Sequence, residues 1–244
     1  MTKAVVTGHS RGLGAAIADA LLCEGIPVLA LSRRGNAELA GRFGDALTEV
    51  AIDLADGEAC ARWAGSDALA RFFEGASRAL LVNNAGVVEP IGPAGTLDAG
   101  EIVRAVTLNV AAPIVLANAF LSATGNVPDR RILHISSGAG RSAVPGWSTY
   151  CATKAALDRH AQTVAADDLA GVRVESLAPG VIDTDMQAQI RATTPEQFVM
   201  RERFVALKEN AGLIGPAECG RQAVAHLLGA GFGLDTLTDL RTHA

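Results

Sequence analysis

The chain alternates between short apolar runs and longer segments in which apolar residues recur at helical spacing. The short runs are rich in Val, Leu, Ile and Ala and have the lengths of β-strands. They cover residues 3–8, 27–32, 48–54, 79–86, 131–138 and 172–180. Several are apolar at almost every position, which is typical of parallel strands covered on both faces. A further short strand is predicted at 234–240.

Helical periodicity fills most of the space between these runs. The segments predicted to be helices are 12–25, 57–77, 98–123, 148–170 and 216–230. Strands that alternate with helices of this length indicate βαβ units. The pattern therefore predicts an α/β fold, a single doubly wound parallel sheet with helices on both faces, in one domain that spans residues 1–244.

Residues 183–214 interrupt the alternation of strands and helices. This segment is helical in character, is more charged than its surroundings, and follows the sixth predicted strand. Ligands of open α/β sheets bind outside the carboxyl ends of the strands. We therefore expect residues 183–214 to form a helical lid over the substrate.

Composition and charge narrow the classes of partner. Apolar residues make up 49% of the 244 residues, and the net charge is −5. A mildly acidic chain without runs of Lys or Arg has no electrostatic attraction for nucleic acid or for an anionic membrane surface. The longest apolar stretch, 110–121, contains Pro113 and Asn118, which favours a buried helix over a membrane span. Neither nucleic acid nor membrane is predicted as a partner.

Cysteine and histidine spacing bears on compartment and metals. The cysteines match neither a zinc site nor a disulfide framework; they are Cys23, Cys60, Cys151 and Cys219. Reduced cysteines, together with a first strand that begins without a signal-like segment, predict a cytoplasmic protein. The histidines show no metal-type spacing, and no metal site is predicted; they are His9, His134, His160, His226 and His243.

The stretch TGHSRGLG, residues 7–14, joins the first predicted strand to the first predicted helix. A glycine-rich turn in this position is typical of a dinucleotide site, because glycine lets the backbone approach a pyrophosphate closely. The helix N-terminus adds free N–H groups and partial positive charge. The residues predicted to contact the cofactor here are Gly8, Ser10, Arg11, Gly12, Leu13 and Gly14.

The end of the second strand indicates which dinucleotide is bound. Enzymes that prefer NAD place an acidic residue there to hold the ribose 2′-hydroxyl. This chain has Ser32, Arg33 and Arg34 at that place, and Arg11 lies in the glycine turn. Guanidinium groups form charge-assisted, often bidentate contacts with phosphate. The cofactor is therefore predicted to be NADP(H), with Arg33 and Arg11 near the 2′-phosphate.

Two further strand ends are expected to line the cofactor. The third strand ends in Asp53 and Leu54, where the Asp side chain can accept from the adenine amino group. The fourth ends in NNAG, whose residues Asn84, Ala85 and Gly86 are small or polar enough to let a ribose and a nicotinamide pass close to the backbone.

Tyr150 and Lys154 are spaced i, i+4 and share one face of a predicted helix. Tyrosine normally titrates near pH 10, and a neighbouring ammonium lowers that pKa. We therefore expect Tyr150 to act as a general acid in carbonyl reduction. Ser137, at the end of the fifth strand, is expected to donate to the developing oxyanion.

Other residues near the tyrosine are candidates for the substrate site. Trp147 lies three positions before Tyr150, where it either lines the pocket or packs at the start of the helix. Met186 and Phe204 of the expected lid are either pocket walls or core residues. The predicted substrate contacts are Ser137, Trp147, Tyr150 and Met186.

In this order, the glycine turn, NNAG, the serine and the Tyr–Lys pair resemble the short-chain dehydrogenase/reductase family over essentially the whole chain. The resemblance implies a Rossmann fold and a catalytic tetrad, Asn109, Ser137, Tyr150 and Lys154. In the family the tyrosine donates the proton and the serine polarises the carbonyl. The lysine holds the nicotinamide ribose and lowers the tyrosine pKa, and the asparagine helps to anchor a water of the proton relay.

The resemblance extends to PGVIDT, residues 179–184, which is similar to the turn after the sixth strand in the family. Pro179 and Gly180 belong to this turn, and Ile182 and Thr184 are implied to meet the nicotinamide carboxamide. The family also associates through helices equivalent to 98–123 and 148–170. The resemblance therefore implies a homodimer or a homotetramer.

A narrower resemblance is to the sepiapterin reductase and benzil reductase branch, carried by residues 136–156, 183–191 and 206–214. It implies reduction of a small-molecule carbonyl by NADPH, either an α-diketone or a side-chain ketone on a pterin. Asp239 sits where the pterin-binding enzymes place an anchoring Asp, but the residues around it differ. The alternatives are a 3-oxoacyl-carrier-protein reductase and a non-catalytic NADP-sensing regulator.

Overall fold

The computed structural model describes residues 1–242, which form one seven-stranded parallel sheet. The strands are β1 (Thr2–Thr7), β2 (Val28–Ser32), β3 (Leu47–Ala51), β4 (Arg78–Asn83), β5 (Asp129–Ile135), β6 (Val172–Ala178) and β7 (Leu237–Asp239). Their order across the sheet is β3-β2-β1-β4-β5-β6-β7. The doubly wound parallel sheet predicted from the sequence is confirmed, including the short last strand, which pairs with β6.

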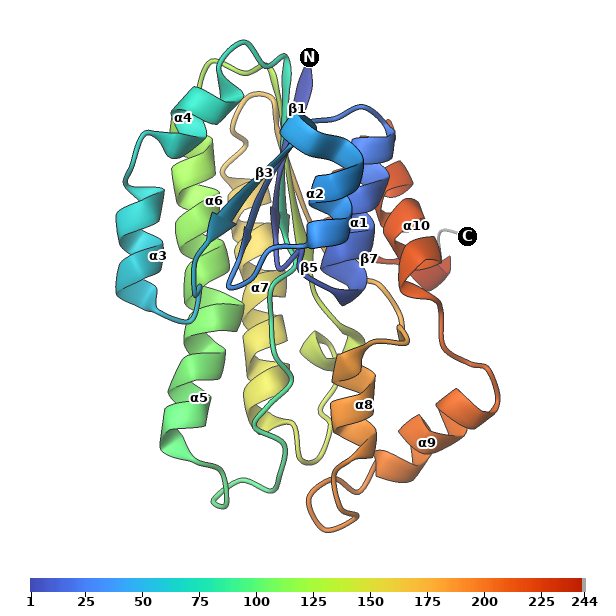
Figure 1. The fold of residues 1–244 in the computed structure, drawn as a ribbon. Coiled ribbons are helices and arrows are strands. Elements are labelled where there is room, and N and C mark those ends of the chain that lie inside the picture. Colours follow the sequence, from blue (N-terminus) through green and yellow to red (C-terminus); the bar gives the residue numbers. More distant parts are fainter. Residues whose placement is uncertain (243–244) are drawn as a thin grey trace.

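Residues 1–242 contain ten α-helices, most of which cover the two faces of this sheet (Figure 1). They are α1 (Gly12–Cys23), α2 (Ala37–Phe43), α3 (Gly57–Ala64), α4 (Ala68–Phe73), α5 (Ala99–Val106), α6 (Ala112–Ala123), α7 (Ser148–Ala166), α8 (Asp185–Arg191), α9 (Arg201–Glu209) and α10 (Pro216–Leu228). Helices α1, α2 and α10 lie on one face, and α4, α6 and α7 lie on the other.

Alternating side chains of each central strand enter the two cores. In β1, Ala4 and Val6 pack with α1 and α10, whereas Val5 packs with the α6 layer. Successive side chains of a strand point to opposite faces, so a strand covered on both sides must be apolar throughout. This explains the unbroken apolar runs seen in the sequence.

The sheet changes winding direction between β1 and β4. The chain runs outward from β1 through β2 to β3, returns to β4 on the other side of β1, and continues to β7. A switch point of this kind opens a crevice at the carboxyl ends of the strands, where ligands of doubly wound sheets bind. The glycine turn follows β1 and NNAG ends β4, so both motifs lie at the switch point.

The structure corrects three helix predictions. The helix expected over 57–77 is divided into α3 and α4, because Gly65 ends α3 and a short turn follows. Helix α2 was not predicted; it is only seven residues long, and Asn36 caps it by accepting from Leu39 N. Helix α7 ends at Ala166 rather than at 170.

The helix expected over 98–123 is continuous but not uniform. Between α5 and α6 the chain makes a π-helical turn at Thr107–Ala111, with Asn109 at its centre. By length and composition alone, Ala99–Ala123 is apolar enough to cross a membrane. In this fold, however, Leu116 and Phe120 are buried against the sheet. The apolar composition is that of a core helix, as expected from the sequence.

Residues 183–214 leave the sheet and form a separate layer over its carboxyl edge. They contain α8 and α9, which stand apart from the main helical layers in Figure 1. A parallel bridge between Ile182 and Ile214 closes the segment at its base. The segment expected to form a lid is therefore a loop that contains two helices, and the two ends of this loop lie side by side.

Candidate functional site

The glycine turn after β1 is shaped so that side chains would not fit. Gly8 and Gly12 have φ values of +76° and +60°, in the left-handed region that favours glycine. A Cβ atom on Gly14 would lie 2.2 Å from the carbonyl oxygen of Gly8 and 2.3 Å from Nδ2 of Asn84. The turn and the start of α1 therefore pack backbone against backbone at this point.

Thr7 locks the end of β4 to this turn. Its Oγ1 accepts from the backbone N–H groups of Asn84 and Ala85, each at 2.9 Å. The Asn84 side chain returns the contact by donating from Nδ2 to the Thr7 carbonyl at 2.9 Å. These bonds end β4 at Asn83 and hold the next three residues in a fixed path beside the glycine turn.

Asn109 holds the following segment in place. Its Nδ2 donates to the Val87 carbonyl at 2.8 Å, and its Oδ1 accepts from Val87 N at 2.9 Å. Nδ2 also lies 3.2 Å from Oγ1 of Thr153, one residue before Lys154. A Cβ on Gly86 would be 3.1 Å from Asn109 Oδ1 and 3.7 Å from Lys154 Nζ. Single-turn π-helical segments are frequent at functional sites.

The predicted catalytic side chains meet at the start of α7. The side chains of Ser137 and Tyr150 are hydrogen-bonded to each other. Lys154 Nζ lies 5.7 Å from the centroid of the Tyr150 ring and donates to the Ile135 carbonyl at 2.8 Å. Tyr150 and Lys154 are both buried. The structure thus brings together Ser137, Tyr150 and Lys154, with Asn109 linked to them through Thr153.

The pKa values differ from the sequence-based expectation. Burial raises the pKa of Tyr150 to about 12, and the hydrogen bond with Ser137 only partly opposes this rise. Burial lowers the pKa of Lys154 to about 8, opposed by the charge of Asp158. The expected lowering of the tyrosine pKa by the lysine is therefore wrong for the chain by itself. Loss of solvation raises the tyrosine pKa by more than an ammonium over the ring could lower it.

The arginines predicted for the 2′-phosphate are arranged differently from one another. Arg11 Nη1 lies 2.6 Å from Oδ2 of Asp185, which joins the glycine turn to the first helix of the lid. Both side chains are exposed, so this pair contributes little to stability. Arg33 is also exposed, directly after β2. Arg33 and its neighbour Arg34 both face solvent at this strand end.

Asp53 is bound by neighbouring groups. Its Oδ1 accepts from Ala55 N at 3.0 Å, and its Oδ2 pairs with Arg104 Nη2 at 3.0 Å. Partial burial raises its pKa, but these hydrogen bonds outweigh it and the pKa lies below the ordinary value. Leu13 and Leu54 pack their side chains into the two cores, so only their backbones can face a cofactor.

The PG turn after β6 approaches the glycine turn from the other side. Gly180 has a φ of +86°. Cγ2 of Thr184 lies 3.4 Å from where a Cβ of Gly12 would stand. Ile182 is buried and is held by the bridge to Ile214. The PG turn, predicted to meet the nicotinamide end, is therefore brought next to the glycine turn through Thr184.

An aromatic cluster covers the buried tyrosine. Trp147 packs edge-on against Tyr150, with ring centroids 5.3 Å apart, and stacks on Phe198 at 4.8 Å. Phe204 lies against both Trp147 and Phe198. Met186 and Ile190 complete the cluster. Residues of the segment 183–214 thus pack beside Tyr150, and Trp147, Met186 and Phe204 belong to one apolar cluster with it.

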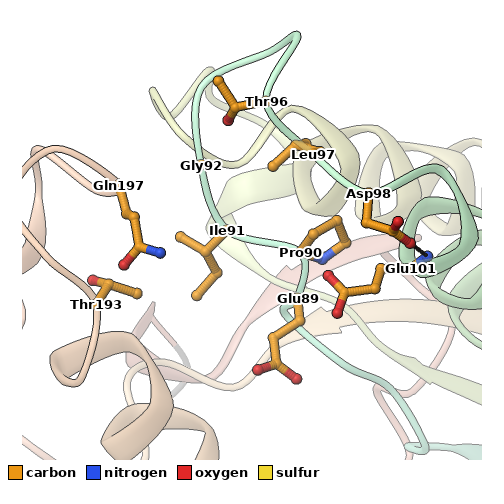
Figure 2. Close-up of a pocket in the computed structure, with 10 residues that line it drawn as sticks. All are labelled: Glu89, Pro90, Ile91, Gly92, Thr96, Leu97, Asp98, Glu101, Thr193 and Gln197. Carbon is orange, nitrogen blue, oxygen red and sulfur yellow. Dashed lines mark hydrogen bonds between the residues drawn. The ribbon is translucent and has the colours of Figure 1, made fainter.

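A pocket of about 360 Å³ opens beside this cluster, between the loop after β4 and the lid (Figure 2). Ile91 lies between the lid residues Thr193 and Gln197 and the carboxylates of the pocket, as Figure 2 shows, and it packs against the aromatic cluster. The carboxylates belong to Glu89, Asp98 and Glu101, and the remaining lining residues are Pro90, Gly92, Thr96 and Leu97.

Two other predictions concern Asp239 and metals. The Asp239 carboxylate is bonded to Arg241, with Nε 2.9 Å from Oδ1, and this hydrogen bond lowers its pKa. Within residues 1–242, no group of three His, Cys, Asp or Glu side chains is arranged to hold a metal ion. His243 lies outside the described residues, so the histidine prediction is not tested there.

Sequence reasoning missed several residues that support the site. Thr7 and Thr153 bind backbone and side chains of the predicted residues. Thr7 directly precedes Gly8, and this position beside the glycine turn is the signal that could have identified it. His9, which shows no metal-type spacing in the sequence, is buried inside the glycine turn against Glu49 of β3. No local spacing links residues forty positions apart, so this contact was beyond the sequence pattern.

Comparison with known proteins agrees with this geometry. A family model described as short chain dehydrogenase matches residues 2–195. The chain belongs to the short-chain dehydrogenase family. The matched region contains the glycine turn and the β4 end described above, together with Asn109, Ser137, Tyr150 and Lys154. The members of this family are oxidoreductases. The resemblance to short-chain dehydrogenases/reductases inferred from the sequence is confirmed.

Similar proteins place the chain within one branch of the short-chain dehydrogenases. A benzil reductase ((S)-benzoin forming) of Bacillus cereus is 37% identical over 93% of this chain and 94% of its own length. The sepiapterin reductase of Bos taurus is 32% identical, covering 87% and 84% respectively. A crystal structure of a short-chain dehydrogenase/reductase from Burkholderia vietnamiensis is 42% identical, with a TM-score of 0.73 and coverage of 100% and 98%.

Proposed function

We propose that this short-chain dehydrogenase is an NADPH-dependent carbonyl reductase that acts on an α-diketone of the benzil type or on a pterin side-chain ketone. One observation carries the proposal. Ser137, Tyr150 and Lys154 meet in a buried position beside the glycine crevice, with an apolar lid over the tyrosine. The names of the similar benzil and sepiapterin reductases support the choice of substrate.

The crevice fits a dinucleotide. The first turn of α1 offers backbone N–H groups beside glycines that admit no side chain, which suits a pyrophosphate. Arg33 at the end of β2 suits a 2′-phosphate, and Gly86, close to Lys154 and Asn109, leaves room for a ribose. The short-chain dehydrogenase family uses NAD(P), and when bound, the reduced nicotinamide supplies the hydride.

The residues of the chain handle the proton and the substrate oxygen. With a pKa of about 12, Tyr150 is fully protonated at neutral pH, the state a general acid requires. Ser137 is placed to donate to the same substrate oxygen. Lys154, with a pKa of about 8, keeps its positive charge at neutral pH and favours the phenolate left after proton transfer. The lid excludes water from these steps.

The acidic pocket favours a reductase of small neutral ketones over a 3-oxoacyl-carrier-protein reductase. A 3-oxoacyl reductase of carrier-protein substrates must receive an acidic partner near its active site. Glu89, Asp98 and Glu101 line the pocket beside the aromatic cluster, and like charges raise the cost of such docking. The non-catalytic regulator is disfavoured because serine, tyrosine and lysine are all present and close together.

A turnover assay tests the proposal. NADPH oxidation is followed at 340 nm with benzil, other α-diketones and sepiapterin, each also with NADH. We expect turnover of at least one of these ketones and a kcat/KM at least about tenfold higher with NADPH than with NADH. No turnover of any of them would contradict the assigned substrate class, and equal rates with both nucleotides would contradict the assigned cofactor.

We also propose that two copies of the chain associate through α5 and its neighbour α7. Val103 and Val106 are three positions apart on α5, so they share a face, and they are 64% and 42% exposed. Helices α5 and α7 are in contact, which makes a continuous surface of the kind expected from the sequence. A second copy would bury both valines.

Light scattering of the purified protein tests this surface. The wild type should have a molar mass twice the 25.1 kDa of one chain, or four times that mass if the dimers pair. Val103→Glu should lower the molar mass to that of a single chain, because a buried carboxylate would destabilise the interface. Val199→Glu is the matched control, because Val199 is 67% exposed but lies in the lid. A Val103→Glu protein that keeps the wild-type mass would contradict the proposed interface.

The cysteines support a cytoplasmic location, which we also propose. All four are free thiols, and Cys60 and Cys219 are buried. Burial raises the pKa of both, which keeps them as unreactive thiols at neutral pH. This chemistry suits a reducing compartment.

A further inference from the structure

A buried histidine lies inside the glycine turn and contacts the neighbouring strands β2 and β3. His9 follows Gly8 and is 1% exposed. Its Nε2 lies 2.6 Å from Oε1 of Glu49 on β3, and its Nδ1 lies 3.2 Å from Oγ of Ser32, the last residue of β2. His9, Ser32 and Glu49 thus form a hydrogen-bonded chain under the place where β2 ends.

The donors and acceptors in this chain determine the charge of the histidine. A carboxylate only accepts, so Nε2 must donate to Glu49. The single hydroxyl proton of Ser32 is directed to the Arg34 carbonyl, so Ser32 Oγ is left as an acceptor for Nδ1. With both ring nitrogens donating, His9 is an imidazolium, and this buried cation forms an ion pair with the partly exposed carboxylate of Glu49.

Glu49 also holds the loop that carries the two arginines. Its Oε1 accepts from the backbone N–H of Asn36 at 2.6 Å, and its carboxylate lies against Gly35. The Asn36 side chain reaches the carbonyl of His9 at 3.4 Å. The loop of Arg33, Arg34 and Gly35 is therefore fastened to the glycine turn by the same carboxylate that His9 neutralises.

We propose that the His9–Glu49 ion pair determines the preference for NADP(H) over NAD(H). A carboxylate near the end of β2 is the feature by which related folds select NAD, because it accepts from the ribose 2′-hydroxyl and repels a 2′-phosphate. Here a carboxylate reaches this place from β3 rather than from β2. The imidazolium cancels its charge, so that Glu49 does not oppose the field of Arg33 and Arg34.

His9 and Glu49 are specificity-determining residues in this proposal; neither is required to touch the reacting atoms. The inference rests on the proposed function, since it explains the cofactor preference assigned there. It also accounts for the presence of an acidic residue so close to Arg33 and Arg34 in a chain for which we propose NADPH. A carboxylate without this neutralising charge would weaken binding of the 2′-phosphate, because the two anions repel each other and both lose solvation.

Binding of each nucleotide alone tests the pair without relying on turnover. Dissociation constants for NADPH and NADH are measured by calorimetry for the wild type, for His9→Gln, and for His9→Gln combined with Glu49→Gln. A glutamine at position 9 still donates to Glu49 but carries no charge. A glutamine at position 49 still offers an oxygen to Asn36 N–H, so the loop keeps its attachment.

We expect His9→Gln to weaken NADPH binding roughly tenfold while NADH binding changes by less than about threefold, since only the 2′-phosphate meets the exposed charge. The double variant should recover most of the NADPH affinity, because it removes the carboxylate charge. Equal weakening of both nucleotides, or no recovery in the double variant, would overturn the proposal and leave His9 a structural residue.

The wild-type measurement separates this inference from the proposed function. If wild-type protein binds NADPH and NADH equally, the cofactor assignment itself fails. If the wild type prefers NADPH and His9→Gln keeps the same ratio, only the role of the ion pair is wrong. Melting curves of all three proteins show that each is folded when its nucleotide affinity is measured.

Discussion

Tyr150→Phe is expected to lower kcat/KM for ketone reduction by about 100- to 10,000-fold, the range of general acid catalysis. We assign the proton transfer to the substrate oxygen to the Tyr150 phenol. Its neighbour Ser137 hydrogen-bonds to it and remains to polarise the carbonyl. The phenyl ring keeps the packing against Trp147, so the aromatic cluster is preserved.

The control for this variant is nucleotide binding. Tyr150→Phe should bind NADPH within about twofold of the wild type, because the loss falls on the transition state and not on the ground state. A variant that retains wild-type turnover would exclude Tyr150 as the acid.

Turnover of the wild type should also fall as pH rises through about 8, where the free chain loses the Lys154 charge.

Asp129→Asn is expected to lower the free energy of unfolding by about 3 kcal/mol at pH 7, since it leaves buried arginine charge without its counter-ion. Asp129 lies at the start of β5, where Arg173 Nη2 is 2.8 Å from Oδ1 and Arg131 Nε is 3.2 Å from it. Arg78 of β4 binds the other oxygen at 2.5 Å. Arg131 is almost fully buried. Asp129 keeps some exposure, so we place the expected loss of unfolding free energy at the low end of the range for buried ion pairs.

The pH dependence of this loss has a definite sign. Burial raises the pKa of Asp129, but the hydrogen bonds from Arg131, Arg173 and Arg78 outweigh it and hold the pKa well below the ordinary 3.8. The carboxylate therefore contributes stability above pH 3.8, and this contribution is lost as the pH falls below it. The difference in unfolding free energy between the wild type and Asp129→Asn should accordingly stay nearly constant from pH 7 down towards 3.8, and it should narrow as the pH falls below that value.

Urea unfolding at several pH values measures this difference. Asp45→Asn is the matched control: it makes the same chemical change at an exposed position and should alter stability by less than about 0.5 kcal/mol. A difference that stays constant across the pH range would show that Asp129 acts through packing and not through its charge.

Much of the fold was predictable from local pattern. Strands buried on both faces must be apolar at every position, so their runs stand out, and the helical periodicity between them requires a parallel sheet. The errors came where local signals are weak. Helix α2 has only seven residues, and Gly65 divides the predicted helix 57–77 without changing its apolar periodicity.

The predicted catalytic residues could be assigned because their spacing follows from single elements. Tyr150 and Lys154 share one helix face, and Ser137 lies at the strand end just before it. The pKa of Tyr150 could not be assigned in this way. It depends on burial by the lid residues Phe198 and Phe204 and by Trp147, which are brought together only in the folded chain.

The sequence by itself determined the order of strands and helices, the glycine turn and the Tyr–Lys pair, because each depends on neighbours within about five residues. Only the tertiary structure decided that His9 meets Glu49, that Arg11 meets Asp185, and that Thr7 ties β4 to the glycine turn. These contacts join residues from 40 to 174 positions apart. The physical reason is that charge, burial and hydrogen bonding act through space, so they are settled by which elements the parallel sheet brings to one edge.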